Sequence, residues 1–174
     1  MLLDLSRMRG TRDRFERSYL PSAFVTSEQD FTVAQPVTLA FDVFKNNREI
    51  RLVGRVSTAL QLLCSRCLEP FTFAVDLPFD LLYLPHSDNR GEGEIEIEDD
   101  DLGTAFYRDH VIDLGQLMNE QFYLATPMKP LCREACRGLC PHCGTNLNES
   151  TCNCEAIWVD PRLEVLRSLT REGK

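Results

Sequence analysis

The chain has 174 residues, of which 43% are hydrophobic, and a formal net charge of −8 at pH 7. This length suits one ordinary domain with a small appendage, and the apolar content is enough to bury a core. The N-terminus lacks the apolar core of a signal peptide, and no apolar run approaches the ~18 to 20 residues that a membrane span needs. We therefore expect a cytoplasmic protein without membrane contact. Its thiols should stay reduced, so a disulfide framework is disfavoured.

The negative charge is concentrated in one acidic strip, residues 92–101 (EGEIEIEDDD), which holds seven acids and no base. Outside this strip the chain is nearly neutral. Five arginines lie near the start of the chain: Arg7, Arg9, Arg12, Arg14 and Arg17. Such groups can meet phosphate, but a charge count specifies little, so solvated surface charge is favoured over direct RNA contact.

Apolar residues recur with a period of two in three runs, which predicts three strands. The runs cover residues 37–43, 50–62 and 71–79. Asn46-Asn47 separates the first two runs, which therefore form a hairpin, and the third follows after a short connection. We predict an antiparallel meander with one buried face.

The segment after these strands, residues 86–104, opens with turn formers and is expected to be mostly an exposed loop. A helix is then predicted over 113–126. Asp113 stands at its cap and Gln116 at its third position, and the apolar spacing is helical until the next proline. This helix should cover the open face of the sheet.

A second, short helix is predicted at the end of the chain, because Asp160-Pro161 supplies a cap and a proline at the first helical position. The predicted fold class is therefore α+β: the meander, one packed helix, a cysteine-rich metal knuckle and the terminal helix. Three regions are expected, namely an arginine-rich segment with a first strand (1–30), a β-rich body (31–128), and the knuckle with the terminal helix (129–174).

The knuckle is predicted from six cysteines crowded near the C-terminus: Cys132, Cys136, Cys140, Cys143, Cys152 and Cys154. Thiolates are soft ligands for zinc, and Cys140-Pro-His-Cys143-Gly144 has the two-residue spacing and trailing glycine of a metal knuckle. The preferred site is Cys140 and Cys143, completed from Cys136, Cys152 and Cys154. Ligands on both sides of the chain reversal at 146–148 enclose an ion more fully than four packed close together. One structural zinc ion is expected, and the spacing disfavours an iron–sulfur cluster.

A separate pair, Cys64 and Cys67, lies between two predicted strands. Arg66 between them would favour a thiolate, as in a redox centre, but thioredoxin-like pairs lie where a strand meets a helix. Two interpretations stay open. The pair is half of a metal site completed by late cysteines, or it is two thiols at a hairpin tip with Arg66 facing a partner.

The sequence favours a protein that is not an enzyme. It contains no glycine-rich phosphate loop and no G-x-S-x-G elbow, and its three histidines do not fall into a metal or triad spacing. An all-cysteine site is usually closed and structural. We expect no catalysis and no small-molecule substrate.

Four motifs stand in a recognisable order: CSRCLEPF, IDLGQLMNEQFYLATPMKPLC, CRGLCPHCGTNLN and VDPRLEVLRSL. Together they resemble the YceD family, the large ribosomal RNA subunit accumulation proteins, over roughly residues 35–172. The resemblance implies a bacterial cytoplasmic protein needed for normal levels of large-subunit (23S) ribosomal RNA. Some members of that family lack the late cysteines, so the resemblance alone does not make metal binding essential to the shared role.

Two mechanisms are compatible with this resemblance. In the first, the protein is a ribosome biogenesis factor that engages precursor large-subunit ribosomal RNA or an early large-subunit ribosomal protein. In the second, it is an acidic interaction module that binds a basic ribosomal protein through residues 92–101 without contacting RNA. The overall charge favours the second mechanism.

Overall fold

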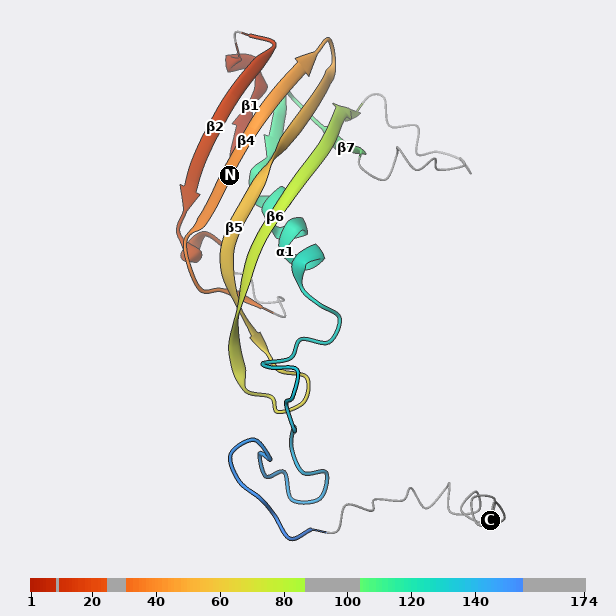
Figure 1. Ribbon diagram of the computed structural model, residues 1–174. Helices are drawn as coiled ribbons and strands as arrows, with labels where there is room; N and C mark the ends of the chain where they lie inside the picture. Colours follow the sequence, from red (N-terminus) through yellow and green to blue (C-terminus); the bar gives the residue numbers. More distant parts are fainter. Residues whose placement is uncertain (9, 25–30, 87–103, 155–174) are drawn as a thin grey trace, which may run out of the picture. The chain divides into compact units, whose positions relative to one another are not determined.

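The computed structural model describes residues 1–8, 10–24, 31–86 and 104–154. The chain splits into two compact units (Figure 1). Unit 1 combines Met1–Leu62 with Phe71–Pro130, and unit 2 combines Leu63–Pro70 with Leu131–Lys174. The acidic strip and the predicted terminal helix lie outside the described residues, so both stay predictions.

Unit 1 is built on a six-stranded sheet with the order β2-β4-β5-β6-β7, and β3 pairs with β5 beside this path. Its strands are β2 (Arg12–Tyr19), β3 (Thr32–Val33), β4 (Val37–Asn46), β5 (Glu49–Leu63), β6 (Pro70–Pro85) and β7 (Thr104–Tyr107). The pairs β2–β4, β3–β5 and β4–β5 are antiparallel. The β4–β5 pair agrees with the predicted hairpin, and β2 and β3 extend the sheet beyond the three strands of the predicted meander.

The last pair corrects that prediction, because β7 runs parallel to β6 and the sheet is therefore mixed. Parallel neighbours need a crossover connection of a dozen or more residues, and β6 is separated from β7 by residues 86–103. The period-two pattern identifies strands, but it carries no information on the direction in which a distant strand returns.

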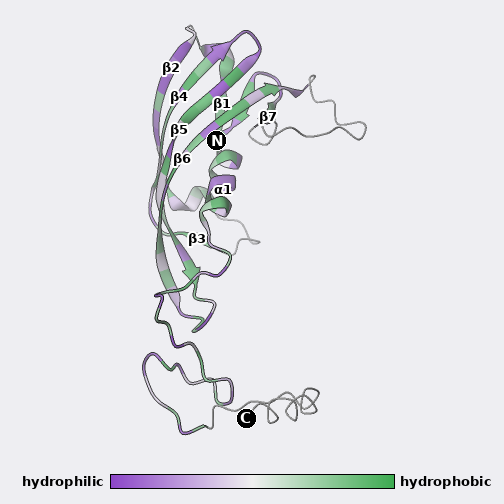
Figure 2. Ribbon diagram, turned by 45° about the vertical axis from the view of Figure 1, so that its right-hand side comes forward, coloured by the Kyte–Doolittle hydropathy of each residue, from purple (hydrophilic) through white to green (hydrophobic). Residues whose placement is uncertain are grey.

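The central hairpin shows how the sequence sets the register. Val37, Leu39 and Val43 are fully buried on one face of β4, as their alternation predicts. Phe41 pairs with Gly54 of β5, where an added Cβ would lie 2.4 Å from the Phe41 Cβ. Gly54 therefore leaves room for the aromatic side chain on the neighbouring strand. In Figure 2 the strands carry hydrophobic residues interspersed with hydrophilic ones.

One helix, α1 (Leu114–Ala125), packs against the sheet (Figures 1 and 2). The Asp113 carboxylate accepts hydrogen bonds from the backbone N–H groups of Gly115 (2.7 Å) and Gln116 (3.3 Å), which fixes its start. The Gln116 side chain donates to Glu120 rather than reaching back to the cap. No helix in the described part of the chain is long and apolar enough to cross a membrane.

The core of unit 1 lies between α1 and the sheet. Phe122 is fully buried, and its ring meets those of Phe24 and Phe31 edge to face, at centroid distances of 5.6 and 6.0 Å. A short two-stranded sheet of β1 (Leu2–Asp4) and β8 (Val111–Asp113) leads into the helix. Two 3-10 turns, η1 (Leu5–Arg7) and η2 (Pro21–Phe24), complete the described elements.

Candidate metal centres

The predicted knuckle at Cys140 is formed by two backbone hydrogen bonds. The N–H of Gly144 donates to the carbonyl of Cys140 (2.9 Å), and the N–H of Cys140 donates to the carbonyl of Thr145 (2.8 Å). Gly144 has a φ of +72°, a left-handed conformation that glycine adopts without strain. The turn that the Cys-x-x-Cys-Gly spacing predicts is therefore present.

The turn at Cys64 repeats this hydrogen-bond pattern residue for residue. The N–H of Leu68 donates to the carbonyl of Cys64 (2.9 Å), and the N–H of Cys64 donates to the carbonyl of Glu69 (3.0 Å). Leu68 takes the place of Gly144, with a φ of +60°. The connection between β5 and β6 is thus a second knuckle, which the sequence conceals because leucine rarely adopts a left-handed conformation. The Cys-x-x-Cys spacing was the available signal.

The eight cysteines of the chain form two groups of four. The first centre contains Cys64, Cys67, Cys132 and Cys136, and the second centre contains Cys140, Cys143, Cys152 and Cys154; within each, all sulfur atoms lie within 4.8 Å of one another. All eight cysteines are free, so neither group is a disulfide pair. Both centres belong to unit 2.

This grouping differs from the single site that the sequence favoured. Cys136 and Cys132 lie with Cys64 and Cys67, while Cys152 and Cys154 alone complete the set of Cys140 and Cys143. The geometry thus matches the interpretation in which the early pair is half of a metal site completed by late cysteines. The six late cysteines lie close together in sequence, which suggested a single site. Their spacing carries no information on Cys64 and Cys67, which the β5–β6 connection brings to Cys132 and Cys136.

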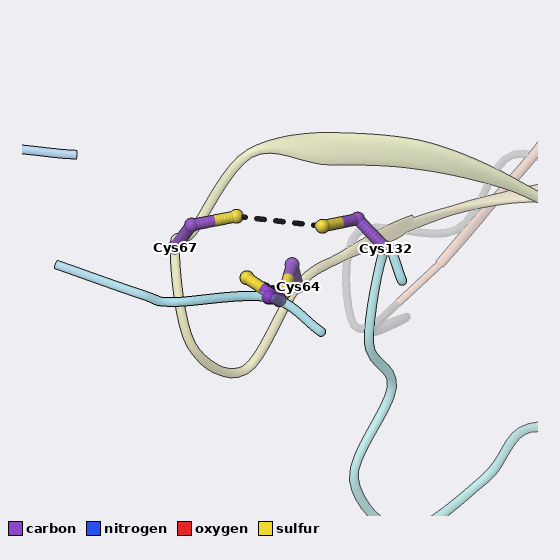
Figure 3. Close-up of side chains that lie close together, drawn as sticks. Cys64, Cys67 and Cys132 are labelled. Carbon is purple, nitrogen blue, oxygen red and sulfur yellow. Dashed lines mark hydrogen bonds between the residues drawn. The ribbon is translucent and has the colours of Figure 1, made fainter. Parts of the chain in front are cut away.

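The distances between sulfur atoms in the first centre fit tetrahedral coordination of a metal ion. Cys64 Sγ lies 3.8 Å from Cys136 Sγ, and Cys67 Sγ lies 3.8 Å from Cys132 Sγ. A zinc ion with four Zn–S bonds of about 2.3 Å places its sulfurs about 3.8 Å apart. Figure 3 shows the sulfurs of Cys67 and Cys132 directed toward each other from the hairpin tip and the segment after α1.

Arg66 connects the two segments that build the first centre. Its Nη1 donates to the carbonyls of Glu134 (3.2 Å) and Cys136 (2.8 Å), and its own carbonyl accepts from the N–H of Leu139 (3.0 Å). An added Cβ on Gly138, whose φ is +73°, would lie 3.0 Å from that carbonyl oxygen. Arg66 therefore engages the backbone of its own unit, and a partner contact of this residue stays a prediction.

Asn148 supports the first centre although it lies between ligands of the second in sequence. Its Nδ2 donates to Cys136 Sγ (3.3 Å), and its Oδ1 accepts from the N–H of Arg137 (2.8 Å). Nδ2 also donates to Asn146 Oδ1 (2.9 Å) within the chain reversal. Hydrogen bonds to ligand atoms orient them and tune the metal, so Asn148 links the reversal to the first centre.

The two centres differ in exposure. Cys64, Cys67 and Cys136 are buried, whereas Cys143 and Cys154 of the second centre are exposed. His142 is exposed beside the second knuckle and does not belong to either sulfur group.

The thiols do not ionise alike. Burial opposes ionisation of Cys64, but backbone N–H groups, led by that of Cys132, lower its pKa to about 6. The hydroxyl and N–H of Thr145 likewise lower the pKa of Cys143 to about 6. Burial and the neighbouring thiols raise the pKa of Cys132 to about 12, and the Cys143 thiol raises the pKa of Cys154 to about 12. A dication would allow all four thiolates at each centre, so metal binding should release protons and weaken as the pH falls.

Three of the N-terminal arginines that the structure describes make contacts within the chain. Arg7 pairs with Asp4 (3.2 Å), and Arg12 pairs with Asp42 (3.4 Å). Arg17 lies over the ring of Phe15, 5.7 Å from its centroid. These contacts favour the interpretation of surface charge over a phosphate-binding arm.

Comparison with known proteins connects this arrangement to one family. The family model "Large ribosomal RNA subunit accumulation protein YceD" matches residues 52–170, which include every cysteine. Chloroplastic YCED homolog 1 proteins are similar to the chain: that of Zea mays is 32% identical over 152 residues (72% of this chain, 52% of the relative), and that of Arabidopsis thaliana is 27% identical over 154 residues (72% and 46%). An uncharacterized protein of Mycobacterium leprae is 29% identical over 113 residues (64% and 49%).

The chain spans about half the length of the curated relatives it matches. No solved structure gives a significant match.

Proposed function

Because the chain belongs to the YceD family of large ribosomal RNA subunit accumulation proteins, we propose that it supports accumulation of large-subunit ribosomal RNA as a non-catalytic factor with two structural zinc ions. The observation that carries this proposal is the family match over residues 52–170, which spans both knuckles and α1. The bacterial cytoplasmic location that the sequence predicts stays a prediction, since the maize and Arabidopsis relatives are named chloroplastic.

Zinc is the ion that the donor sets favour. Four thiolates in tetrahedral spacing suit zinc or an iron site, and knuckle turns around closed four-cysteine sets are typical of structural zinc. A closed set leaves no coordination position for a substrate or water, which supports a role in folding rather than catalysis. The first centre would fasten the β5–β6 tip to the segment after α1, and the second would close the reversal between its two cysteine pairs.

The interior of unit 2 supports the same role. Its buried side chains within the described residues are all cysteines: Cys64, Cys67, Cys136 and Cys140. Every residue of the buried hydrophobic cluster belongs to unit 1. A unit this small without an apolar core needs another source of stability, and metal coordination is a common one.

The alternative function is an acidic module that binds a basic ribosomal protein through residues 92–101. Its support is the composition of that strip, seven acids without a base. Deleting 92–101 from the tagged chain and recovering it from growing cells tests this alternative. Loss of a co-purifying basic protein would favour the module, and unchanged recovery would exclude the strip as its binding surface.

The proposed function is tested by depleting the protein in its native cells and measuring the ratio of large-subunit to small-subunit ribosomal RNA. We expect the ratio to fall and to recover when the wild-type chain is supplied. A Cys64→Ser, Cys140→Ser double variant should fail to restore it because both centres lose a ligand. An unchanged ratio after depletion would contradict the proposal.

A further inference from the structure

A pocket of about 500 Å³ lies in unit 1, and none of its lining residues is a cysteine. It is lined by the β4–β5 turn, the end of β6 and the connection between β7 and β8. Five of its lining residues are basic and are called the basic pocket here: Lys45, Arg48, His86, Arg108 and His110. The one acid in the lining is Asp109. Even with both histidines neutral, positive charge outnumbers negative charge.

Hydrogen bonds to backbone carbonyl groups fix the residues around this pocket. The Tyr107 hydroxyl donates to the carbonyl of Arg48 (3.0 Å), which joins the β7–β8 connection to the β4–β5 turn. The N–H of Leu5 donates to the carbonyl of His110 (2.9 Å). Asp109 and His110 both have left-handed φ angles, +51° and +59°, a conformation that costs energy in residues other than glycine and tends to occur at functional sites. The basic side chains therefore project from a fixed frame.

Elsewhere on the same sheet, arginines are matched by acids. Arg51 pairs with Asp80 (2.5 Å) and Arg55 pairs with Asp76 (2.8 Å), and these contacts lower the pKa of both carboxyl groups. In the basic pocket, by contrast, Arg108 contacts His86, so two basic side chains lie against each other. A guanidinium group only donates, so in this contact the ring nitrogen of His86 is the acceptor.

An exposed aromatic ring lies beside this contact. Phe106 is 40% exposed, and its ring lies 6.4 Å from that of His86. Cationic side chains next to an exposed ring are the two components of single-strand recognition, since the cations meet phosphates and the ring stacks on a base.

We propose that the basic pocket binds backbone phosphates of RNA, with Lys45 and Arg108 as principal phosphate contacts and Phe106 as a stacking surface. Guanidinium groups match phosphate oxygens through paired N–H donors, and an ammonium group supplies a compact charge. The identity of the RNA as precursor large-subunit ribosomal RNA rests on the proposed function. The binding chemistry of the pocket does not.

The test measures fluorescence anisotropy of a labelled large-subunit RNA fragment with the zinc-loaded full chain, from low to moderate salt. A Lys45→Ala, Arg108→Ala variant should bind at least about tenfold more weakly and lower the slope of log affinity against log salt by about two. An Arg51→Ala, Arg55→Ala variant removes the same charge from the same sheet and should bind like the wild type. Circular dichroism checks that both variants fold.

Two further variants test whether RNA binds at the basic pocket. Phe106→Ala should weaken binding with little change in the salt slope, because it removes stacking rather than charge. Deleting 92–101, which begins six residues after His86, should tighten binding by removing like charge. The inference would be overturned if Lys45→Ala, Arg108→Ala and Arg51→Ala, Arg55→Ala weakened RNA binding equally. Loss of RNA binding on deletion of 92–101 would also overturn it. Equal affinity for an acidic polypeptide such as polyglutamate would overturn it in favour of a protein partner.

The outcome is separable from that of the proposed function. If depletion lowers the ribosomal RNA ratio and the Lys45→Ala, Arg108→Ala variant restores it fully while binding RNA normally, the pocket inference fails and the function stands. If the pocket binds RNA but depletion leaves the ratio unchanged, the function fails and the pocket inference stands.

Discussion

The two units of this chain bury different kinds of side chain. Unit 1 has a continuous apolar core in which Phe122 of α1 meets the sheet, whereas every buried side chain described in unit 2 belongs to a cysteine. Burial of apolar surface is nondirectional and spread over many residues. Metal coordination depends on a few atoms at fixed distances. With zinc bound as proposed, the chain would combine a unit that tolerates single substitutions with one that depends on individual ligands.

Removing the metal should have the largest effect and should separate the two units. Structural zinc contributes about 10–16 kcal/mol of apparent binding energy in small metal-dependent domains. We expect two zinc ions per chain, and their removal by a chelator should abolish amide-exchange protection in residues 131–154 while β4, β5 and α1 stay protected. Elemental analysis and hydrogen exchange make the measurement.

Cys64→Ser and Cys140→Ser provide the matched controls for this experiment, since each removes a ligand from one centre only. Each variant should retain one ion. Substantially less than one zinc per wild-type chain would contradict the proposed zinc binding. Loss of amide-exchange protection in unit 1 together with unit 2 would contradict separate stabilisation of the two units.

A core substitution in unit 1 should have the reciprocal effect. Phe122→Ala removes a fully buried ring and should lower the free energy of unfolding of unit 1 by about 3–5 kcal/mol. The zinc content should remain at two, because the centres lie in unit 2. Leu124→Ala, at a position 77% exposed, is the control and should change stability by less than about 0.5 kcal/mol. Loss of zinc in Phe122→Ala would contradict independent stabilisation.

Asn148 tests whether the second segment supports the first centre. In a Cys140→Ser background that keeps only the first centre, Asn148→Ala should weaken zinc binding by about 10–100-fold, because Cys136 Sγ loses a hydrogen bond from Nδ2. Chelator competition measures this change. Glu149→Ala, one residue further along, should leave the affinity of that centre unchanged. An effect of equal size at Glu149 would show that the whole reversal, rather than this hydrogen bond, is responsible.

The two left-handed glycines of unit 2 offer a finer comparison. Gly138→Ala and Gly144→Ala should each cost about 1–2 kcal/mol of backbone strain. Gly138→Ala should cost about 1 kcal/mol more, because its new Cβ would press on the Arg66 carbonyl, while nothing lies within 4 Å at Gly144. Chelator-dependent unfolding measures both. Equal costs would show that the contact between Gly138 and Arg66 yields without penalty.

Leu68→Gly should have the smallest effect, and it runs in the opposite direction. Leu68 is 62% exposed and left-handed, so glycine relieves strain there while increasing the entropy of the unfolded chain. We expect a net gain of less than about 1 kcal/mol for the first centre. Leu63→Gly, at an exposed strand position with no such strain, should be destabilising. A loss of stability in Leu68→Gly would indicate that the leucine side chain itself supports the knuckle.

Much of unit 1 could be predicted from the sequence, because local patterns determine it. The alternation of Val37, Leu39, Phe41 and Val43 marks a strand with one buried face, and Asp113 marks the start of α1. The direction of β7 could not be predicted, since parallel pairing depends on how a distant segment returns to the sheet.

The candidate metal centres also have one part that the sequence predicts and one part that it does not. The knuckle turn at Cys140 and Cys143 could be predicted from the sequence, because a turn of two intervening residues is local. Only the tertiary structure decided that Cys136 and Cys132 leave that cluster to join Cys64 and Cys67, and that Leu68 adopts the glycine conformation. The physical reason is that coordination depends on distance in space, and the hairpin between β5 and β6 brings together thiols that the sequence keeps far apart.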